Sequence, residues 1–269
     1  MKAVDFEYDG QFLSDYGFII CDFDGSTDVN VVEIGFKITF NKVPTFHGKR
    51  HVLVNTVYDD CISTTFDICK NPEVYDDLEI TNDDFRDLAR WLNRRTFLKL
   101  CIFDADEDYD SVYFNAGFNI EKIKIGEKIC GLRLSMETDS PFAYGKEIVH
   151  KATLTSSSDS YLLSDMSDDV GFIYPTITIN CKSSGTLTLS NSATSVNTVI
   201  KNCSNGETIT INGDTLNVTT NKSNHKIYDD FNYEFFMIGN TINERRNRIS
   251  ASIPCELEIR YNPIIKDLP

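Results

Sequence analysis

Apolar and polar residues alternate along most of this 269-residue chain, which is the pattern of β-strands with one buried face. Residues 4–25 read as short strands broken by turns that contain glycine. Residues 33–57 alternate, cross a basic stretch at residues 47–51, and return as a second strand. This second segment therefore predicts a long hairpin with a basic tip.

The segment TNDDFRDLARWLNRR departs from the strand pattern. Its apolar residues follow helical spacing at Phe85, Leu88, Ala89 and Leu92. Thr81 or Asn82 precedes Asp84 in the manner of a helix-capping signal. Acids gather at the start and arginines at the end, as the helix dipole favours. We therefore expect one α-helix, over residues 83–95.

The segment METDSPFAYG, residues 136–145, interrupts the strands in the middle of the chain. Pro141 cannot donate a backbone hydrogen bond to a sheet, so the strand that ends at Thr138 must stop or change partners. Aromatic residues follow the proline, without a Gly/Ser tract. We interpret the segment as a short, packed crossing between two domains, residues 1–142 and residues 143–269.

The second half consists almost entirely of strand and turn patterns at the spacing of a β-sandwich. The strongest turn signal is Asn212-Gly213, which suits a two-residue turn of type I′. In that register Ile209 faces Leu216 on one buried face. The predicted fold class is mainly β, with one α-helix in the first domain and a β-sandwich as the second.

Composition narrows the class of protein. No run approaches the roughly 18 consecutive apolar residues that a membrane helix needs, and the start, MKAVDFEYDG, lacks the apolar segment of a signal peptide. We therefore expect a protein that is made in a cytoplasm and has no membrane contact. The eight cysteines form no CxxC motif, so free thiols are expected.

Charge is distributed unevenly along the chain. Residues 1–144 hold 15 Lys and Arg against 27 Asp and Glu, whereas residues 145–269 hold 11 against 14. Binding to duplex DNA requires Lys and Arg to replace counterions along the phosphates. The acidic balance makes this chain a poor candidate for gripping DNA.

Two clusters resemble metal sites without completing either pattern. Asp104, Asp106, Asp108 and Asp110 have the spacing of a calcium loop, but the sixth and twelfth positions, which should be Gly and an acid, are Tyr109 and Asn115. We interpret this run as a solvated hairpin tip. His47 and His51 have the spacing of a helical zinc pair, but no Glu follows His47 and no Cys pair is near. No catalytic motif is present, so we expect neither an enzyme nor a cofactor.

Six segments occur in an order that carries a family resemblance across essentially the whole chain: FEYDGQFLSDYGFII, DDFRDLARWLNRRTFLKLCIFD, GLRLSMETDSPFAYG, YPTITINCKSSGTLTLSN, NGETITING and YEFFMIGNTIN. In this order the sequence resembles the distal tail (Dit) proteins of long-tailed bacteriophages. The resemblance implies a structural protein of the phage virion, located at the tail tip. It also implies a ring-forming N-terminal domain and a galectin-like C-terminal β-sandwich.

The resemblance further implies a set of neighbours. Six N-terminal domains would form a homo-hexameric ring between the tail tube protein and the tail-tip hub, also called the tail-associated lysin. The tape-measure protein and receptor-binding proteins would lie nearby. DNA would pass through the ring without specific binding, which suits the acidic balance of the first half.

The basic tip of the predicted hairpin is the candidate contact between subunits, through His47, Lys49, Arg50 and His51. The alternative for these residues is a solvated loop. For the whole chain, the alternative function is a glycan-binding host-adhesion module of a tail-like particle. Against that alternative, the only Trp lies in the predicted helix and the aromatics of the second half alternate as core residues do.

Overall fold

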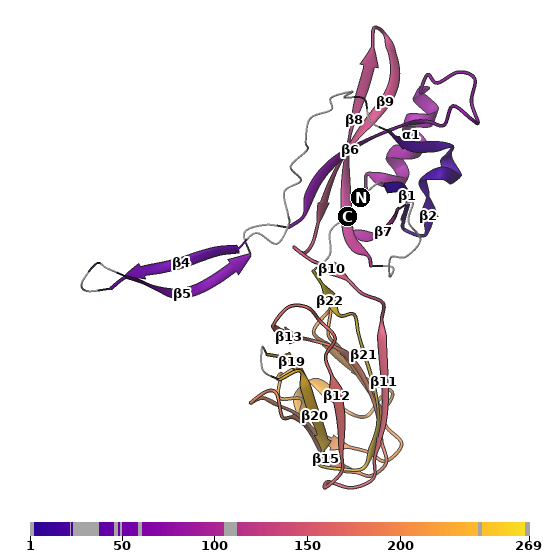
Figure 1. Cartoon of the computed structure of the whole chain (residues 1–269). Helices are drawn as coiled ribbons and strands as arrows, with labels where there is room; N and C mark the ends of the chain where they lie inside the picture. The colour runs from indigo at the N-terminus through magenta and orange to yellow at the C-terminus, as the bar shows by residue number, and fades with distance from the viewer. Residues whose placement is uncertain are drawn as a thin grey trace. The chain divides into compact units, whose positions relative to one another are not determined.

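A computed structural model describes residues 3–21, 23, 38–45, 48, 50–58, 61–104, 112–241 and 244–266. The chain is mainly β, as predicted, and divides into two compact units (Figure 1). The N-terminal unit comprises Met1–Gly145 and Lys266–Pro269, and the C-terminal unit comprises Lys146–Ile265. No helix in the described part of the chain is long and apolar enough to cross a membrane. That residues 1–142 and 143–269 fold independently of each other stays a prediction.

The N-terminal unit is built on a seven-stranded antiparallel sheet in the order β2-β1-β7-β8-β9-β6-β3. Its strands are β1 (Ala3–Tyr8), β2 (Gln11–Phe12), β3 (Phe18–Cys21), β6 (Ser63–Lys70), β7 (Leu98–Asp104), β8 (Phe114–Ile125) and β9 (Lys128–Thr138). The unit also holds a 3-10 turn η1 (Leu13–Tyr16), the hairpin strands β4 (Ile38–Pro44) and β5 (His51–Tyr58), the short strand β10 (Ala143–Tyr144), and the helix α1 (Asn82–Leu92).

The predicted helix is confirmed, although it begins one residue earlier than expected, at Asn82, and also ends earlier. Thr81 is the N-cap: its hydroxyl accepts a hydrogen bond from the Asp84 amide at 3.2 Å, and the Asp84 carboxylate accepts one from the Thr81 amide at 2.8 Å. This reciprocal arrangement satisfies two backbone donors that would otherwise lack partners. The helix ends at Leu92 rather than Arg95, because Asn93 leaves the helical conformation with φ −83° and ψ 76°.

Trp91 of α1 lies at the centre of an aromatic core over the sheet. Its ring stacks on Phe6 at a centroid distance of 5.6 Å and on Tyr16 at 4.5 Å. Its Nε1 donates to the carbonyl oxygen of Tyr8 at 2.8 Å, so the buried indole has no unsatisfied polar group. Helix and sheet are thereby joined through one side chain.

The segment after β9 ends the sheet as predicted. The Thr138 hydroxyl accepts from the Ile62 amide at 2.9 Å and lies 2.7 Å from the Ser140 carbonyl, to which it donates. Tyr144 then exchanges two backbone hydrogen bonds with Tyr113, at 2.8 and 2.9 Å. These contacts keep residues as far as Tyr144 within the N-terminal unit.

The C-terminal unit is the predicted β-sandwich. One sheet has the order β11-β21-β14-β17-β18 and the other β12-β20-β15-β16. The strands are β11 (Ile148–Leu154), β12 (Ser160–Ser164), β14 (Thr176–Cys181), β15 (Gly185–Asn191), β16 (Asn197–Cys203), β17 (Thr208–Asn212), β18 (Asn217–Thr220), β20 (Arg246–Ala251) and β21 (Cys255–Tyr261). Both sheets contribute to a single hydrophobic core. Short strands β13 (Gly171–Ile173), β19 (Ile238–Asn240) and β22 (Ile264–Ile265) complete the unit.

The Asn212-Gly213 turn has a different register from the predicted one. Asn212 pairs with Asn217, which leaves a four-residue loop instead of a two-residue turn, and Ile209 faces Thr220 instead of Leu216. The loop is closed by Asn212, whose Oδ1 accepts hydrogen bonds from the Thr215 amide at 2.8 Å and the Thr215 hydroxyl at 2.9 Å. A Cβ atom on Gly213 would lie 1.8 Å from the Tyr174 carbonyl oxygen. Glycine serves here for close approach of two backbones, a role that the dipeptide signal does not distinguish from a tight turn.

A short helix, α2 (Ile227–Asp230), was not expected from the sequence. In the segment YEFFMIGN, only the last three residues form a strand, β19. Two of the buried cysteines, Cys181 and Cys255, face each other across β14 and β21, and both remain free thiols. Burial raises the pKa of Cys255 to about 11, so its thiol stays protonated.

Candidate assembly interface

The strands β4 and β5 form the predicted hairpin. They pair antiparallel from Ile38 opposite Tyr58 to Pro44 opposite His51, with a register shift at Asn41. At the tip, the Thr45 amide donates to the Arg50 carbonyl at 2.8 Å. Among the described strands, β4 and β5 pair only with each other (Figure 1).

Both faces of this hairpin carry exposed apolar side chains. The register shift leaves Val54 of β5 without an opposite residue, so the faces follow from the pairing. Val52 lies opposite Val43, Val54 is the unpaired residue, Leu53 lies opposite Lys42 on the other face, and Val57 lies opposite Thr39 on the face of Val52. The exposed fractions of Val52, Val54, Leu53 and Val57 are 57%, 63%, 51% and 45% in that order. On β4, Ile38, Phe40 and Val43 are exposed as well. A nearly continuous apolar run is typical of a strand that is covered on both faces.

Such a hairpin is poorly stable by itself. A two-stranded sheet has only edge strands, and an isolated one is marginally stable in water. The apolar side chains here also exceed what a solvent-exposed element needs. The hairpin therefore has the chemistry of a segment that a partner covers.

The hairpin is also the basic part of an acidic unit. Residues 38–58 include Lys42, Lys49 and Arg50 and no Asp or Glu. Arg50 and His51 are exposed, and His51 begins strand β5 rather than lying in the loop. His47 and Lys49 lie outside the described residues. The structure therefore brings two of the four candidate contact residues to the hairpin tip.

Sequence reasoning found the basic tip and missed the apolar faces. The signal was present in HVLVNTVY, where Val52, Leu53 and Val54 follow one another without alternation. The prediction also left out Lys42, the third cation of the hairpin. In the structure its Nζ lies 5.8 Å from the centroid of the Phe40 ring.

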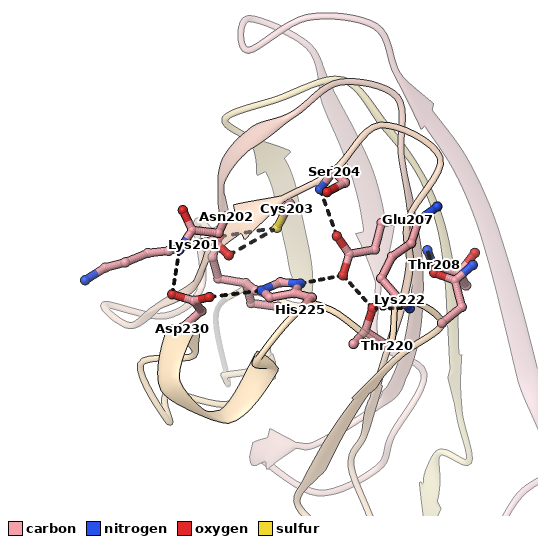
Figure 2. Close-up of polar contacts among 12 residues, drawn as sticks. Lys201, Asn202, Cys203, Ser204, Glu207, Thr208, Thr220, Lys222, His225 and Asp230 are labelled. Atoms are coloured by element: carbon pink, nitrogen blue, oxygen red, sulfur yellow. Dashed lines mark hydrogen bonds and ion pairs between the residues drawn. The ribbon is translucent and has the colours of Figure 1, made fainter.

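A second cluster of titratable groups lies inside the C-terminal unit (Figure 2). The fully buried Glu207 accepts hydrogen bonds from the Ser204 amide at 2.8 Å and from the Thr220 hydroxyl at 2.5 Å. Its Oε1 also lies 2.5 Å from His225 Nδ1. On the other side of the imidazole, Nε2 lies 3.3 Å from Asp230 Oδ2, without the alignment of a hydrogen bond.

This cluster joins separate segments of the sandwich. Glu207 lies in the turn between β16 and β17, Thr220 ends β18, His225 precedes α2, and Asp230 ends α2. The imidazole is 4% exposed and therefore out of reach of a substrate. The arrangement is that of a structural ion pair that fastens α2 to the sandwich.

The pKa shifts of Glu207 and His225 define the pH range in which this pair stabilises the folded protein. Burial alone would lower the pKa of His225, but the hydrogen bond and charge of Glu207 raise it above 6.5. Burial alone would raise the pKa of Glu207, but the hydrogen bonds from Thr220 and His225 lower it below 4.5. The stabilisation from His225 is complete below pH 6.5 and is lost as pH rises through its raised pKa. The stabilisation from Glu207 is complete above pH 4.5 and is lost as pH falls through its lowered pKa.

Replacing His225 with Asn is therefore expected to have a pH-dependent cost. The loss of unfolding free energy should be largest between pH 4.5 and 6.5 and should shrink as pH rises above that window. Urea unfolding followed by near-ultraviolet circular dichroism, at pH values inside and above the window, measures this. A flat profile for His225→Asn would show that the pair is not charged in the folded protein.

A pocket with mostly polar residues in its lining lies on the five-stranded sheet of the sandwich, lined by Lys151, Ala152, Thr153, Thr178, Asn180, Glu256, Leu257 and Glu258. No aromatic side chain is in this lining, so the pocket lacks the stacking surface of a typical sugar site. In the described residues, no group of three His, Cys, Asp or Glu side chains is arranged to hold a metal ion. Asp106, Asp108 and Asp110 lie outside those residues.

Comparisons with known proteins find a matching family model for each half of the chain. A family model described as "Phage tail protein N-terminal domain" matches residues 1–140, and one described as "Phage tail C-terminal domain" matches residues 142–261. A search of curated proteins finds no match.

A solved structure with a similar fold is that of the Dit protein of SPP1, described as a paradigm of the hub adsorption apparatus in phages that infect Gram-positive bacteria. The TM-score is 0.66 at 15% sequence identity, and the match covers 97% of this chain and 99% of that chain. At this identity the comparison establishes a shared fold, over both units.

Proposed function

This chain belongs to a family of phage tail proteins, and from that premise we propose that it assembles through its β4–β5 hairpin into a hexameric ring at the tail tip. The ring joins the tail tube to the tail-tip hub. The role is structural, with no catalytic step. The fold shared with the SPP1 Dit protein supports this position.

The observation that carries the proposal is the exposure of apolar side chains on both faces of the hairpin. A partner must cover such an element, and a second copy of the chain is present in any assembly. A closed ring is made when each subunit reaches to the next with one surface and receives the previous subunit with another. A hairpin suits the reaching role.

The proposed neighbours follow from this position. The tail tube protein lies on one side of the ring and the hub, or tail-associated lysin, on the other, with the tape-measure and receptor-binding proteins nearby. DNA passes through the ring, and the excess of 27 acids over 15 bases in residues 1–144 keeps it from adhering.

Negative-stain electron microscopy of the purified chain tests the proposal. Class averages with six-fold symmetry are expected, with a matching mass by light scattering. A chain that stays monomeric at every concentration would overturn the ring. Binding of the chain to a glycan array, without rings, would favour the adhesion module instead.

Reversing the charge of the hairpin tip is expected to weaken the ring. Each exposed ion pair contributes roughly 0 to 1 kcal/mol, but a ring repeats the contact at every interface. The double variant Lys49→Glu with Arg50→Glu should therefore shift the chain toward monomers. The shift should be larger at low salt, where screening is weak. Sedimentation velocity at two salt concentrations measures it, and the fluorescence of Trp91 checks that the N-terminal unit stays folded. An unchanged ring at both salt concentrations would show that the tip is a solvated loop.

A further inference from the structure

If the hairpin reaches to a neighbouring subunit, the same chain must also carry a receiving surface. A ring in which every contact is equivalent needs two different and complementary patches on each subunit. The hairpin is apolar and basic, so its receiver should be exposed, apolar and acidic, and firmly held in place.

Residues 71–79, between β6 and α1, meet this description and are called the acidic loop below. The loop contains Glu73, Asp76, Asp77 and Glu79 and no Lys or Arg. Val74 is 63% exposed and Leu78 is 41% exposed. In this short segment apolar side chains and uncompensated acids lie on the surface together.

The acidic loop is ordered although it has no strand or helix. The buried Lys70 donates from Nζ to the Glu79 carbonyl at 2.9 Å, and the same Nζ lies 5.1 Å from the centroid of the Tyr75 ring. The Tyr75 amide donates to the Asn71 carbonyl at 3.0 Å. A Cβ atom on Gly17 would lie 2.5 Å from the Tyr75 ring, so the ring rests directly on that glycine. A loop anchored at this many points presents its surface without first having to order itself.

Two acids of the loop are available to a partner. Glu79 is paired with Lys128 at 2.8 Å, and Asp77 accepts from the Glu79 amide at 3.1 Å. Within the described part of the chain, no cation pairs with the carboxylates of Glu73 or Asp76. These two acids flank the exposed Val74.

A second apolar patch of this unit fits less well. Phe12 and Phe103 are exposed, with ring centroids 5.5 Å apart. The adjacent Asp5 already accepts from the Ser14 hydroxyl at 2.6 Å and from the Phe6 amide at 2.8 Å. Its charge is therefore engaged within the subunit.

We propose that the acidic loop of each subunit receives the β4–β5 hairpin of the next subunit, with Arg50 and its basic neighbours facing Glu73 and Asp76 and with Val74 covering part of the apolar hairpin. The inference rests on the proposed ring and names the surface that completes it. The partner is a second copy of this chain.

Charge exchange between the two surfaces tests the pairing. The loop variant Glu73→Lys with Asp76→Lys should raise the apparent dissociation constant of the assembly about tenfold or more at low salt, because like charges then meet at every interface. The hairpin variant Lys49→Glu with Arg50→Glu should do the same. A chain that carries all four substitutions should recover the rings, because opposite charges meet again with their signs exchanged.

Mixing the two variants tests the same pairing independently. The loop variant and the hairpin variant, each monomeric alone, should form rings when mixed, since each contact in an alternating ring pairs opposite charges. The control is Glu121→Lys with Glu137→Lys, which changes the same amount of charge at exposed positions of β8 and β9. This control should neither disrupt the wild-type ring nor restore assembly of the hairpin variant.

The outcomes separate this inference from the proposed function. A loop variant that assembles like the wild type, while the hairpin variant does not, would overturn the receiving role of the acidic loop and leave the ring standing. Failure of the four-substitution chain to reassemble would also overturn the direct pairing. A wild-type chain that never forms rings would overturn the proposed function itself.

Discussion

Replacing Glu207 with Ala is expected to destabilise the C-terminal unit by about 3 to 5 kcal/mol, the usual cost of removing one partner from a buried ion pair. The substitution leaves the His225 imidazole beside Asp230 alone and removes the acceptor of the Ser204 amide and the Thr220 hydroxyl. Domains have only about 5 to 15 kcal/mol of stability in total. The change should therefore unfold a measurable fraction of this unit at ordinary temperature.

The measurement uses the thiols of the same unit. Cys181, Cys203 and Cys255 are buried, so their rate of alkylation, followed by mass spectrometry in increasing urea, reports the unfolding of the sandwich. Glu207→Gln keeps an oxygen acceptor and should cost less than Glu207→Ala. Glu244→Ala removes an exposed partner of Arg246 and should change the curve little. Equal effects of Glu207→Ala and Glu244→Ala would contradict a structural role for the buried cluster.

Replacing Trp91 with Ala is expected to destabilise the N-terminal unit by about 3 to 5 kcal/mol. The indole fills the space between Phe6 and Tyr16 and supplies the donor for the Tyr8 carbonyl. Its removal leaves a cavity lined by rings that cannot readily collapse, together with an unsatisfied acceptor. Trp91→Phe restores part of the volume and should cost less.

Two probes distinguish this effect from a general loss of stability. Far-ultraviolet circular dichroism follows the chain as a whole, and alkylation of Cys181, Cys203 and Cys255 follows the C-terminal unit alone. In Trp91→Ala, the circular dichroism should show an unfolding transition at lower urea concentration than in the wild type. The alkylation of the three thiols should follow the same urea dependence as in the wild type. Simultaneous exposure of the three thiols would contradict separate folding of the two units.

Most of the architecture could be predicted because the spacing of apolar and polar residues along the chain indicates where strands and the helix form. The capping residues Thr81 and Asp84 marked the helix start, and the strand patterns of the second half marked the β-sandwich, in which β21 buries alternate side chains. The hairpin was predicted because its strands flank a glycine-containing basic turn. These signals need only neighbours in sequence.

The parts that could not be predicted depend on contacts between distant segments. The Asn212-Gly213 dipeptide indicated a tight turn, whereas the position of Gly213 is fixed by its approach to the Tyr174 carbonyl. The Glu207 and His225 pair lies 18 positions apart and matches no motif. The acidic loop reads as an ordinary polar connection, because its anchoring by Lys70 and Gly17 is visible only in three dimensions.

The chain crosses between its two units twice, and this has a consequence for how such genes change. The described residues before Lys146, and Lys266 after Ile265, belong to the N-terminal unit, while Lys146–Ile265 forms the other unit as one uninterrupted block. Recombination at the two crossings would exchange that block as a cassette and leave the hairpin and the acidic loop in place. Variation in the C-terminal unit would then accumulate without altering the two surfaces that we propose for self-assembly.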